Sequence, residues 1–264
     1  MRDDDSVDRL RLPSFRVDGQ LALVTGASGG IGAGIAIALA EAGADVVLLA
    51  RNQENLERVT RRIDEIGGKS TLVVGDVTDT PLIRKVIAEL PRLDILINNA
   101  GINIPEPLLA VSDEHLDWMI NLNVRAAFVV AQAAVRKMLE DKARRDKGGA
   151  IVNTSSTMGH VGGPDRTVYC MTKHAIEGLT KALAVELAVY RIRANSIAPT
   201  FIETPLFRRI ADTPHMRDFI MARIPLGTLA TVEDIMAAAL YLASPAATMI
   251  TGTHLIVDGG WTAQ

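Results

Sequence analysis

The sequence predicts an α/β fold in a single domain, in which helices flank a parallel sheet of seven strands. Short apolar runs of strand length recur along the 264 residues, and segments of helical length separate them. The chain is 48% hydrophobic, which is enough for one large core, and no linker-like stretch divides it. Strands that alternate with helices in this way form parallel β-α-β units. The expected strands are residues 21–24, 45–50, 71–74, 93–97, 150–153, 193–197 and 253–257.

A glycine-rich turn joins the first strand to the first helix. It contains Gly26, Gly30 and Gly32, together with Ser28 and Ile31, and helical periodicity follows it. Glycines let the backbone turn tightly and let a pyrophosphate approach, while the start of a helix offers unpaired N–H groups and a partial positive charge. The G-x-x-x-G-x-G spacing differs from the best-known fingerprint, but its place between a strand and a helix predicts a dinucleotide site.

The second strand ends without an acidic residue. In NAD sites a carboxylate near this position binds the adenosine 2′-hydroxyl. Here the strand ends at Ala50, and Arg51 offers a guanidinium suited to a 2′-phosphate. The sequence therefore favours NADP(H) over NAD(H), although a solvated arginine at the start of a helix would give the same pattern.

The third and fourth strands also lead into polar or small residues. Asp76 and Val77 follow the third strand, and Asp76 is placed to meet the edge of an adenine. The alternative is that Asp76 caps the next helix, in competition with Thr78. The fourth strand is followed by two amides and two small residues, Asn98, Asn99, Ala100 and Gly101. The amides are suited to fix the loop backbone, and the small residues leave room for a ribose.

Tyr169 and Lys173 lie four residues apart, on one face of a predicted helix. A phenol titrates at about 10 and is a poor base at neutral pH. A cation beside it favours the phenolate and lowers its pKa toward the range of acid–base catalysis. Ser156, at the end of the fifth strand, offers a hydroxyl that can hold a substrate oxygen against Tyr169. On its own, a Tyr–Lys pair at this spacing is common on ordinary helix faces.

Composition argues against several classes of protein. The net charge of −3 gives no reason to expect a nucleic acid or an acidic membrane as a partner. No uninterrupted apolar run reaches the roughly 18 residues of a spanning helix, and the N-terminus has no apolar segment typical of a secretory signal. The single cysteine, Cys170, permits no intrachain disulfide, so we expect a cytoplasmic protein. We interpret residues 1–15 as a polar arm and residues 16–264 as one domain.

Together these motifs resemble the short-chain dehydrogenase/reductase (SDR) family. The resemblance covers residues 16–262, and each motif alone is common whereas the set is specific. It implies a single Rossmann-like, doubly wound domain and hydride transfer between a nicotinamide and a carbonyl or secondary alcohol. The matching motifs are Thr25-Gly26-x-x-x-Gly30-x-Gly32, Asn98-Asn99-Ala100-Gly101, Ser156, Tyr169-x-x-x-Lys173 and Pro199.

The resemblance implies a role for each matching residue. Tyr169 corresponds to the general acid/base, and Lys173 to the residue that lowers the tyrosine pKa and holds the nicotinamide ribose. Ser156 corresponds to the residue that orients the substrate oxygen. Asn123 corresponds to the asparagine that supports a proton-relay water, with Asn121 as the weaker candidate. The resemblance assigns the nicotinamide end of the cofactor to Pro199, Ile202 and Thr204.

Two positions depart from the family pattern. Thr200 stands where the family usually has a glycine after the proline, so the nicotinamide side of the pocket is expected to be narrower. Ser28 stands where NADP(H)-preferring members often have a second basic residue, which keeps NAD(H) possible.

Substrate contacts are expected from Ser156 and Tyr169 and from more variable segments. His160 lies in a glycine-rich loop and is a candidate to line the substrate pocket, although an exposed loop histidine fits equally well. Phe201 and Phe207 lie in a stretch that resembles the family's variable lid. The five histidines show no metal-ligand spacing, so no metal site is predicted.

We expect an NAD(P)(H)-dependent oxidoreductase that interconverts a secondary alcohol and a ketone. A small polar polyol, sugar acid or keto acid fits the modest lid and the 4% aromatic content, and a 3-oxoacyl thioester is the second choice. A non-catalytic dinucleotide-binding protein is a further alternative, against which the intact set of Asn123, Ser156, Tyr169 and Lys173 argues. An epimerase or dehydratase would need a larger C-terminal region, and an enoyl reductase a wider Tyr–Lys spacing.

We also expect a homotetramer, with a dimer as the fallback. The predicted helices at residues 118–138 and 169–189 are apolar over more than one face, as is typical of deep burial or of a subunit contact. In the family that the chain resembles, these helices pack against their copies across a two-fold axis. The residues behind this expectation are Ala126, Ala127, Ala131, Ala133, Ala134, Ala175, Leu179, Ala182, Leu183 and Leu187.

Overall fold

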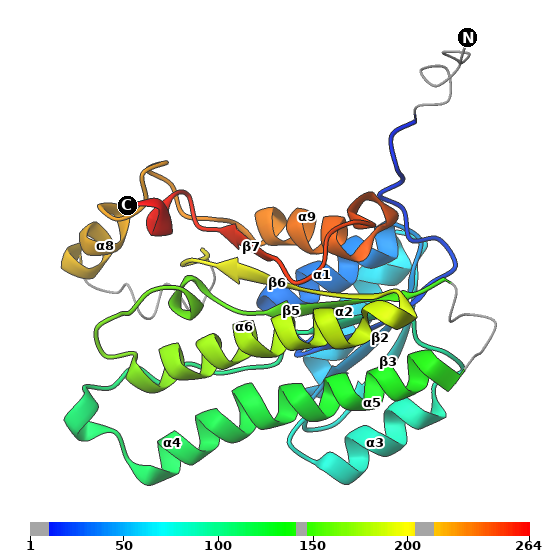
Figure 1. Ribbon diagram of the computed structural model, residues 1–264, viewed down its shortest axis with the longest axis horizontal. Coiled ribbons are helices and arrows are strands. Elements are labelled where there is room, and N and C mark those ends of the chain that lie inside the picture. Colours follow the sequence, from blue (N-terminus) through cyan, green and yellow to red (C-terminus); the bar gives the residue numbers. More distant parts are fainter. Residues whose placement is uncertain (1–10, 141–146, 204–213) are drawn as a thin grey trace.

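Seven parallel strands form the central sheet of the computed structural model, which describes residues 11–140, 147–203 and 214–264 (Figure 1). The strand order is β3-β2-β1-β4-β5-β6-β7, so the direction in which the sheet grows reverses between β1 and β4. Ligands of such sheets bind beyond the carboxyl ends of the strands at this switch point. The predicted α/β fold with seven parallel strands is confirmed. The strands are β1 (Leu21–Thr25), β2 (Asp45–Ala50), β3 (Lys69–Val74), β4 (Ile95–Asn98), β5 (Gly149–Thr154), β6 (Ile192–Pro199) and β7 (His254–Val257).

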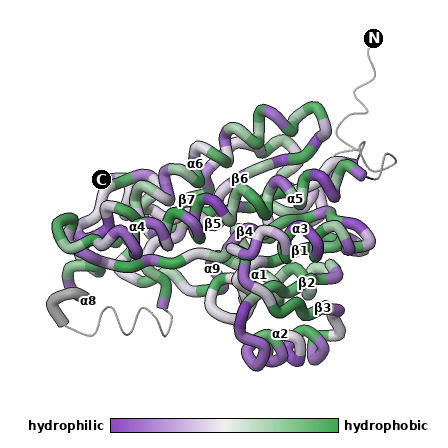
Figure 2. The backbone as a smooth tube through the Cα atoms, turned by 90° about the horizontal axis from the view of Figure 1, so that it is seen from below, coloured by the Kyte–Doolittle hydropathy of each residue, from purple (hydrophilic) through white to green (hydrophobic). Residues whose placement is uncertain are grey.

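Helices cover both faces of the sheet, which explains why the central strands are mainly apolar and buried, with polar residues near their carboxyl ends. Every residue of β1 and β4 is buried, whereas the edge strand β3 exposes half of its residues. Figure 2 shows this contrast as hydrophobic colouring of the inner strands and a largely hydrophilic outer side of α2. One face carries α1 (Gly30–Glu41), α2 (Gln53–Glu65) and α9 (Val232–Ala243), and the other carries α3 (Thr80–Glu89), α5 (Ala127–Glu140) and α6 (Thr167–Leu187). Two shorter helices, α4 (Asp113–Ile120) and α8 (Pro214–Met221), complete the described set.

Helix α3 begins at a cap that sequence reasoning missed. Asp79 is the cap, because its Oδ1 accepts a hydrogen bond from Leu82 N at 3.0 Å. The alternative that Asp76 or Thr78 caps this helix is therefore wrong. Asp76 instead accepts hydrogen bonds from the backbone N and the hydroxyl of Thr78, at 2.8 and 2.7 Å.

The helix predicted at residues 118–138 begins earlier, at Asp113, and changes its winding between residues 121 and 126. Helix α4 passes into a π-helical segment, η3 (Asn121–Ala126), before α5 begins. Single π turns inside helices occur often at functional sites, since they alter the direction of the side chains that follow. Here the turn contains Asn123, whose side chain is buried, and Asn121, which is partly exposed.

The segment from α4 to α5 is a core helix of this fold. By length and composition residues 113–140 could cross a bilayer, but 56% of their most apolar window is buried inside the protein. The five alanines at residues 126, 127, 131, 133 and 134 are all buried in the same chain, and so is Leu187 on α6. The expectation that these six residues form a contact surface was therefore wrong. The large exposed apolar side chains on these two helices are Phe128, Met171 and Val185.

Residues 11–20 precede β1 without forming a helix or strand. The side chain of Phe15 is 45% exposed and packs with its ring 6.1 Å from that of Tyr241 on α9. Val17 is fully buried and its N donates to Ala42 O at 2.9 Å. The described chain thus joins the core at Val17, close to the predicted start of the domain at residue 16.

Candidate active site

The turn between β1 and α1 requires its glycines. Gly26 has a φ of +66°, and a Cβ there would lie 3.0 Å from Asn99 Nδ2. At Gly32, whose φ is ordinary, a Cβ would lie only 2.3 Å from Gly26 O. A side chain at Gly26 would therefore collide with the loop after β4, and one at Gly32 would push α1 away from the turn, so the two glycines allow both close approaches.

The start of α1 is open to a ligand. Its N-cap residue is Gly29, which has no side chain to form a capping hydrogen bond, whereas α2, α3, α4 and α9 are capped by side chains. The first turn consists of Gly30, Ile31 and Gly32, and the N–H groups of a first turn lack partners within the helix. Ile31 also packs against the core with its partly buried side chain. An uncapped first turn behind a glycine turn fits the pyrophosphate of a dinucleotide.

Thr25 and Asn99 hold the end of β4 against the end of β1. The hydroxyl of Thr25 accepts hydrogen bonds from Asn99 N at 2.9 Å and from Ala100 N at 3.0 Å, and Asn99 Nδ2 donates to Thr25 O at 3.0 Å. Asn98 Nδ2 donates to Ala127 O at 2.8 Å. The predicted role of the two asparagines in fixing the loop agrees with this geometry. The sequence analysis included Thr25 in the glycine motif but assigned it no role. A hydroxyl at the end of a buried strand could have indicated that it bonds to a neighbouring strand end.

A cavity of about 420 Å³ opens beyond the carboxyl ends of β1, β2, β3 and β4. It has the size of a pocket for a small molecule or part of a cofactor. Seven predicted cofactor residues line it: Gly26, Ser28, Arg51, Asp76, Val77, Ala100 and Gly101. Six others were not predicted: Ala50, Asn52, Gly75, Thr78, Trp118 and Leu122. Trp118 and Leu122 are four residues apart, and this helical spacing on the segment after β4 could have revealed them.

Arg51 and Asp76 face each other at the rim of this cavity. Arg51 Nη1 lies 3.7 Å from Asp76 Oδ2, and the arginine side chain is 68% exposed. Although burial opposes it, the hydrogen bonds from Thr78 and the charge of Arg51 hold the pKa of Asp76 below its usual value. Asp76 is thus an ionised acceptor in the cavity, and Arg51 remains accessible to an anion.

Ser156 and Tyr169 form the centre of the second half of the site. Ser156 follows β5 and caps the short helix η5 (Thr157–Gly159), where its Oγ accepts from Met158 N at 3.2 Å. Tyr169 lies in the first turn of α6, close enough to Ser156 for that side chain to act on the pKa of its phenol. Ser156 Oγ also lies 3.5 Å from Pro199 O at the end of β6. The two hydroxyls that the sequence paired are therefore neighbours, and their joint role in binding a substrate oxygen stays a prediction.

Lys173 is buried one turn after Tyr169 on α6. Its Nζ donates to Thr154 O at 2.8 Å and lies 5.6 Å from the centre of the Tyr169 ring. Burial lowers the pKa of Lys173 to about 8, against the opposing charge of Glu177. Burial also raises the pKa of the Tyr169 phenol, and its hydrogen bond with Ser156 only partly offsets this. The expectation that the pKa of Tyr169 is lowered was therefore wrong, because burial outweighs the lowering by Ser156 and by the charge of Arg166.

Asn123 lies beside this pair. A Cβ on Gly101 would be 3.1 Å from Asn123 Oδ1 and 3.7 Å from Lys173 Nζ, so these two side chains flank the same glycine. Asn123 exchanges two hydrogen bonds of 2.8 Å with the backbone of Ile102, and its Nδ2 donates to Thr172 Oγ1 at 3.1 Å. The structure therefore places Asn123, the preferred candidate, and not Asn121, next to Lys173.

The remaining predicted residues lie toward β6 and the segment that follows it. Pro199 ends β6, and Ile202 is buried and forms a bridge with Ala230. The ring of Phe201 packs 5.7 Å from that of Trp261. Thr204 and Phe207 lie outside the described residues.

His160 is bonded within the protein, and its predicted contact with a substrate stays a prediction. Its Nε2 lies 3.1 Å from Glu177 Oε1 on α6, and its side chain is only 20% exposed. The alternative of an exposed loop histidine is therefore wrong. The ring of His160 also lies 5.2 Å from that of His254 on β7, where burial lowers the pKa of the imidazole. Sequence reasoning did not find this cluster, because its members come from three distant segments.

Known proteins resemble this chain in sequence and in fold. Residues 26–262 match the model of a family described as enoyl-(acyl carrier protein) reductase. The chain is 36% identical to the 3-oxoacyl-[acyl-carrier-protein] reductase FabG of Thermotoga maritima over 93% of its own length and 99% of that protein. It is 38% identical to the L-xylulose reductase of Mus musculus over 93% and 97%. A crystal structure of a gluconate 5-dehydrogenase from Burkholderia cenocepacia, in complex with NADP and tartrate, is 37% identical with a TM-score of 0.89 and covers 96% of this chain and 99% of that one.

Proposed function

Since the chain belongs to the short-chain dehydrogenase/reductase family of nicotinamide-dependent oxidoreductases, we propose that it interconverts a secondary alcohol and a ketone with Tyr169 as the acid/base. The observation that carries this proposal is the pairing of the Tyr169 and Ser156 hydroxyls, with Lys173 one turn further along α6. The dinucleotide cavity opens on the same edge of the sheet. Two hydroxyls that meet beside a cofactor cavity can hold a single substrate oxygen between them.

The nicotinamide, when bound, supplies or accepts the hydride. In reduction, the Ser156 hydroxyl orients the carbonyl oxygen, and Tyr169 Oη donates its proton to that oxygen. In oxidation, Tyr169 accepts the proton of the alcohol. The raised pKa of Tyr169 keeps the phenol protonated at neutral pH, which suits the reductive direction. Positioned acid–base groups of this kind contribute roughly 10²–10⁴-fold to a rate.

Two buried groups support this pair of hydroxyls. Lys173, whose pKa is about 8, donates to Thr154 O and leaves its remaining N–H groups for a ribose hydroxyl or a water. Asn123 fixes the loop of Ile102 next to it, and we assign to it the support of a water that connects Lys173 with solvent. Both roles depend on the positions in which the π-helical turn holds Asn123 and α6 holds Lys173.

We propose NADP(H) as the preferred cofactor. The exposed guanidinium of Arg51 at the cavity rim supports this preference, because it suits a 2′-phosphate and no carboxylate stands at the end of β2. The relative from Burkholderia cenocepacia was crystallised with NADP. Ser28 in the same cavity adds no positive charge, so NAD(H) stays the alternative. Comparing kcat/KM for the two cofactors tests it.

A small polar polyol, sugar acid or keto acid is the substrate class that we propose. The names of the xylulose and gluconate relatives support it. The test is a screen of alcohols with NADP⁺ and NAD⁺, and of the matching ketones with the reduced cofactors, followed through the absorbance of the reduced nicotinamide. Turnover of polyols or sugar acids with a kcat/KM above that for simple aliphatic alcohols would support the proposal.

A 3-oxoacyl thioester is the second candidate, because the Thermotoga maritima relative is named for that activity. The same screen includes a 3-oxoacyl thioester with NADPH. A kcat/KM for the thioester that exceeds those for all polyols and sugar acids would replace the first candidate by the second. Absence of turnover with every compound, despite cofactor binding, would support the non-catalytic alternative.

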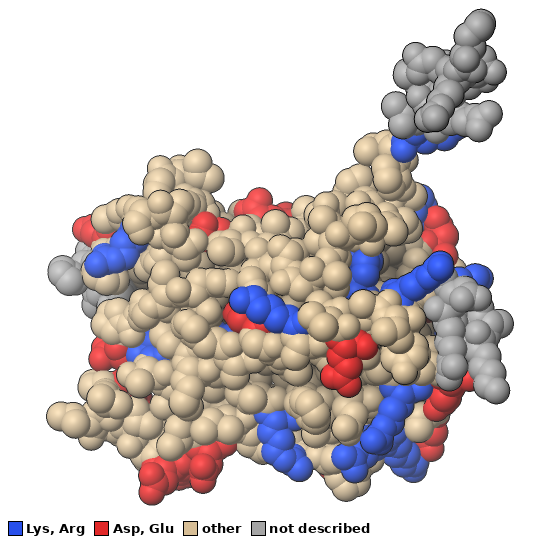
Figure 3. All heavy atoms as spheres, in the orientation of Figure 1, with Lys and Arg blue, Asp and Glu red and all other residues tan. Residues whose placement is uncertain are grey.

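We further propose a homotetramer in the cytoplasm, with a dimer as the smaller form. Exposed Phe128 on α5 and Met171 and Val185 on α6 support a subunit contact over these helices. Helices α5 and α6 lie toward the viewer in Figure 1, and the same view in Figure 3 shows charged side chains scattered over a largely uncharged surface. The single cysteine, Cys170, supports a reducing compartment.

A further inference from the structure

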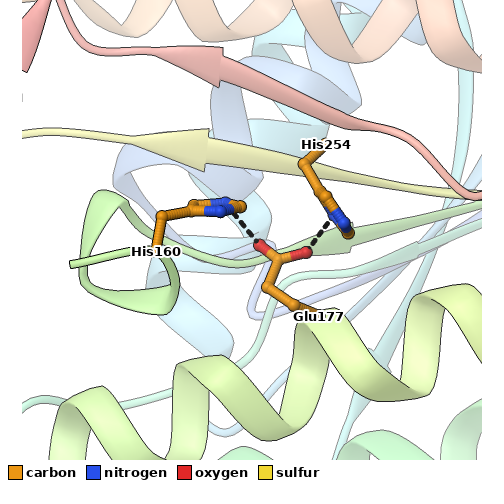
Figure 4. A group of neighbouring side chains, drawn as sticks. All are labelled: His160, Glu177 and His254. Atoms are coloured by element: carbon orange, nitrogen blue, oxygen red, sulfur yellow. Dashed lines mark ion pairs between the residues drawn. The ribbon is translucent and has the colours of Figure 1, made fainter. Parts of the chain in front are cut away.

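Three side chains from separate elements converge between α6 and the last two strands, apart from the paired hydroxyls of the active site (Figure 4). His160 follows η5, Glu177 lies on α6 and His254 begins β7. His160 Nε2 lies 3.1 Å from Glu177 Oε1, and His254 Nδ1 contacts Glu177 Oε2. One ligand atom from each side chain lies within 4.8 Å of the other two.

The carboxylate at the centre is buried and incompletely bonded. The side chain of Glu177 is 7% exposed, and its Oε2 accepts a hydrogen bond from Ser196 Oγ at 2.7 Å. Its Oε1 and His160 Nε2 have no hydrogen-bond partner among the described residues, although they lie 3.1 Å apart. A buried carboxylate without full hydrogen bonding is costly unless a cation or a proton compensates it. Two buried atoms with free lone-pair capacity therefore face the same space.

We propose that His160, Glu177 and His254 bind a divalent transition-metal ion, with Zn²⁺ as the best match. Two imidazoles and one carboxylate are a ligand set that zinc uses in proteins, with a water as the fourth ligand. Imidazole nitrogen is a poor ligand for Mg²⁺ and Ca²⁺, which take oxygen. Tetrahedral zinc places its ligand atoms about 3.4 Å apart. His160 Nε2 and Glu177 Oε1 lie 3.1 Å apart, and the ligand atoms of the three residues all lie within 4.8 Å of one another. His254 Nδ1 and Glu177 Oε2 are in closer contact and would have to move apart to share one ion.

Ser196 is placed to support such a site from outside it. Its hydroxyl donates to Glu177 Oε2 and lies 2.9 Å from His254 Nδ1, so it contacts two of the three ligands. Outer partners of this kind orient ligands and raise metal affinity. When the metal binds, His254 Nδ1 would exchange its contact with Ser196 Oγ for the metal. The hydrogen bond from Ser196 Oγ to Glu177 Oε2 would remain.

The charges around the cluster decide which cations it can select. Lys173 acts electrostatically on Glu177 from the preceding turn of α6, and Lys181 acts on His254 from the following turn. With one carboxylate between two lysines, the cluster has no excess of negative charge to attract a hard, hydrated cation. Its affinity must come from coordination by the two nitrogens, so each histidine is expected to be indispensable.

The metal would connect three elements without touching the reacting atoms. It would tie the loop after η5 and the start of β7 to α6, four residues beyond Lys173. We therefore expect it to stabilise the protein against unfolding and to take no part in hydride transfer.

The experiment uses the full-length, tag-free protein and titrates it with Co²⁺, whose visible absorption reports four-coordinate nitrogen and oxygen ligation. We expect one Co²⁺ per chain, displaced stoichiometrically by Zn²⁺ and not by millimolar Mg²⁺, and a rise in melting temperature with Zn²⁺. No tetrahedral Co²⁺ spectrum at saturation, or displacement by Mg²⁺, would overturn the proposal.

Variants locate the site. His160→Ala, Glu177→Gln and His254→Ala should each weaken Zn²⁺ binding at least about tenfold, whereas the matched control His174→Ala, an exposed histidine on the same helix, should bind Zn²⁺ like the wild type. Because Glu177 is buried, the loop variant His160→Ala carries the test if Glu177→Gln fails to fold. Unchanged Zn²⁺ affinity in His160→Ala and His254→Ala, or loss of binding in His174→Ala, would show that the metal binds elsewhere.

Discussion

Lys173 Nζ lies 5.6 Å from the centre of the Tyr169 ring and donates its hydrogen bond to the carbonyl oxygen of Thr154. The lysine therefore does not bond directly to the phenol, although the two residues are one turn apart on α6. Burial weakens the charge of Lys173 and raises the pKa of Tyr169. Burial thus favours the protonated phenol of Tyr169.

Replacing Tyr169 by phenylalanine should stop catalysis and leave cofactor binding intact. The hydroxyl is the proposed proton donor, so kcat should fall by at least about 10²-fold. Because only one hydroxyl is removed, the affinity for NADPH should change less than about twofold. Fluorescence titration measures that affinity. Tyr190→Phe, at a partly buried tyrosine just beyond α6, is the matched control and should remain fully active. Activity above a few per cent in Tyr169→Phe would refute the assignment.

Burial of Lys173 should make stability depend on pH. Its pKa falls from 10.5 to about 8 on folding, so the unfolded chain binds more protons between these values, and stability rises with pH across that window. The difference corresponds to roughly 3 kcal/mol. Lys173→Met should therefore be more stable than the wild type at pH 7, with a smaller difference at pH 9.5.

Urea unfolding at the two pH values measures this effect. Lys181→Met, at an exposed lysine of the same helix, is the control, and its stability should differ from that of the wild type by the same amount at both pH values. A stability difference between the wild type and Lys173→Met that stays constant from pH 7 to 9.5 would contradict the lowered pKa of Lys173.

A methyl group at Gly32 should disturb both the fold and the cofactor site. Its Cβ would lie 2.3 Å from Gly26 O, so the turn and the helix must separate. We expect Gly32→Ala to lose about 1–3 kcal/mol of unfolding free energy and to bind NADPH more weakly. Gly29→Ala is the control for stability, because its backbone is extended and no atom lies within 4 Å of the added Cβ. Equal melting temperatures of the two variants would contradict the close approach.

Arg51→Asp should shift cofactor preference from NADP(H) toward NAD(H). The change replaces a cation that suits the 2′-phosphate with a carboxylate that repels it and can accept the ribose hydroxyl. The ratio of kcat/KM for NADP(H) to kcat/KM for NAD(H) measures the shift. We expect this ratio to fall at least about tenfold, which corresponds to about 1.4 kcal/mol. Arg61→Asp makes the same charge change elsewhere on α2 and should leave the ratio unaltered. An unchanged ratio in Arg51→Asp would show that Arg51 does not bind the phosphate.

Val185→Asp should weaken the proposed subunit contact. Val185 is 80% exposed on α6, and a carboxylate there would be desolvated against its copy in an assembly. Light scattering during size exclusion should show a tetramer or dimer for the wild type and a smaller species for the variant. Leu109→Asp, at an exposed leucine outside α5 and α6, is the control. A stable, active wild-type monomer near 28.3 kDa would refute the assembly.

The amino-acid sequence by itself determined the order of the elements and the outline of the site. Two of its features are local. The alternation of strand-length and helix-length segments, and the glycines between β1 and α1, predict structure from residues that are close in the sequence. The Tyr169–Lys173 spacing is local as well. Parallel strands bring their carboxyl ends to one edge, so Arg51, Asp76, Gly101 and Ser156 had to approach that edge once the strands were recognised.

Only the tertiary structure decided which groups meet across the sheet and how deeply they are buried. His160 and His254 are 94 residues apart in the sequence and reach Glu177 only because β7 returns beside β6. The alanines of α5 belong to the core because the strands cover them, which their apolar character alone could not distinguish from a subunit contact. The pKa values of Tyr169 and Lys173 depend on burial, and burial follows from the packing of the whole chain rather than from a four-residue spacing.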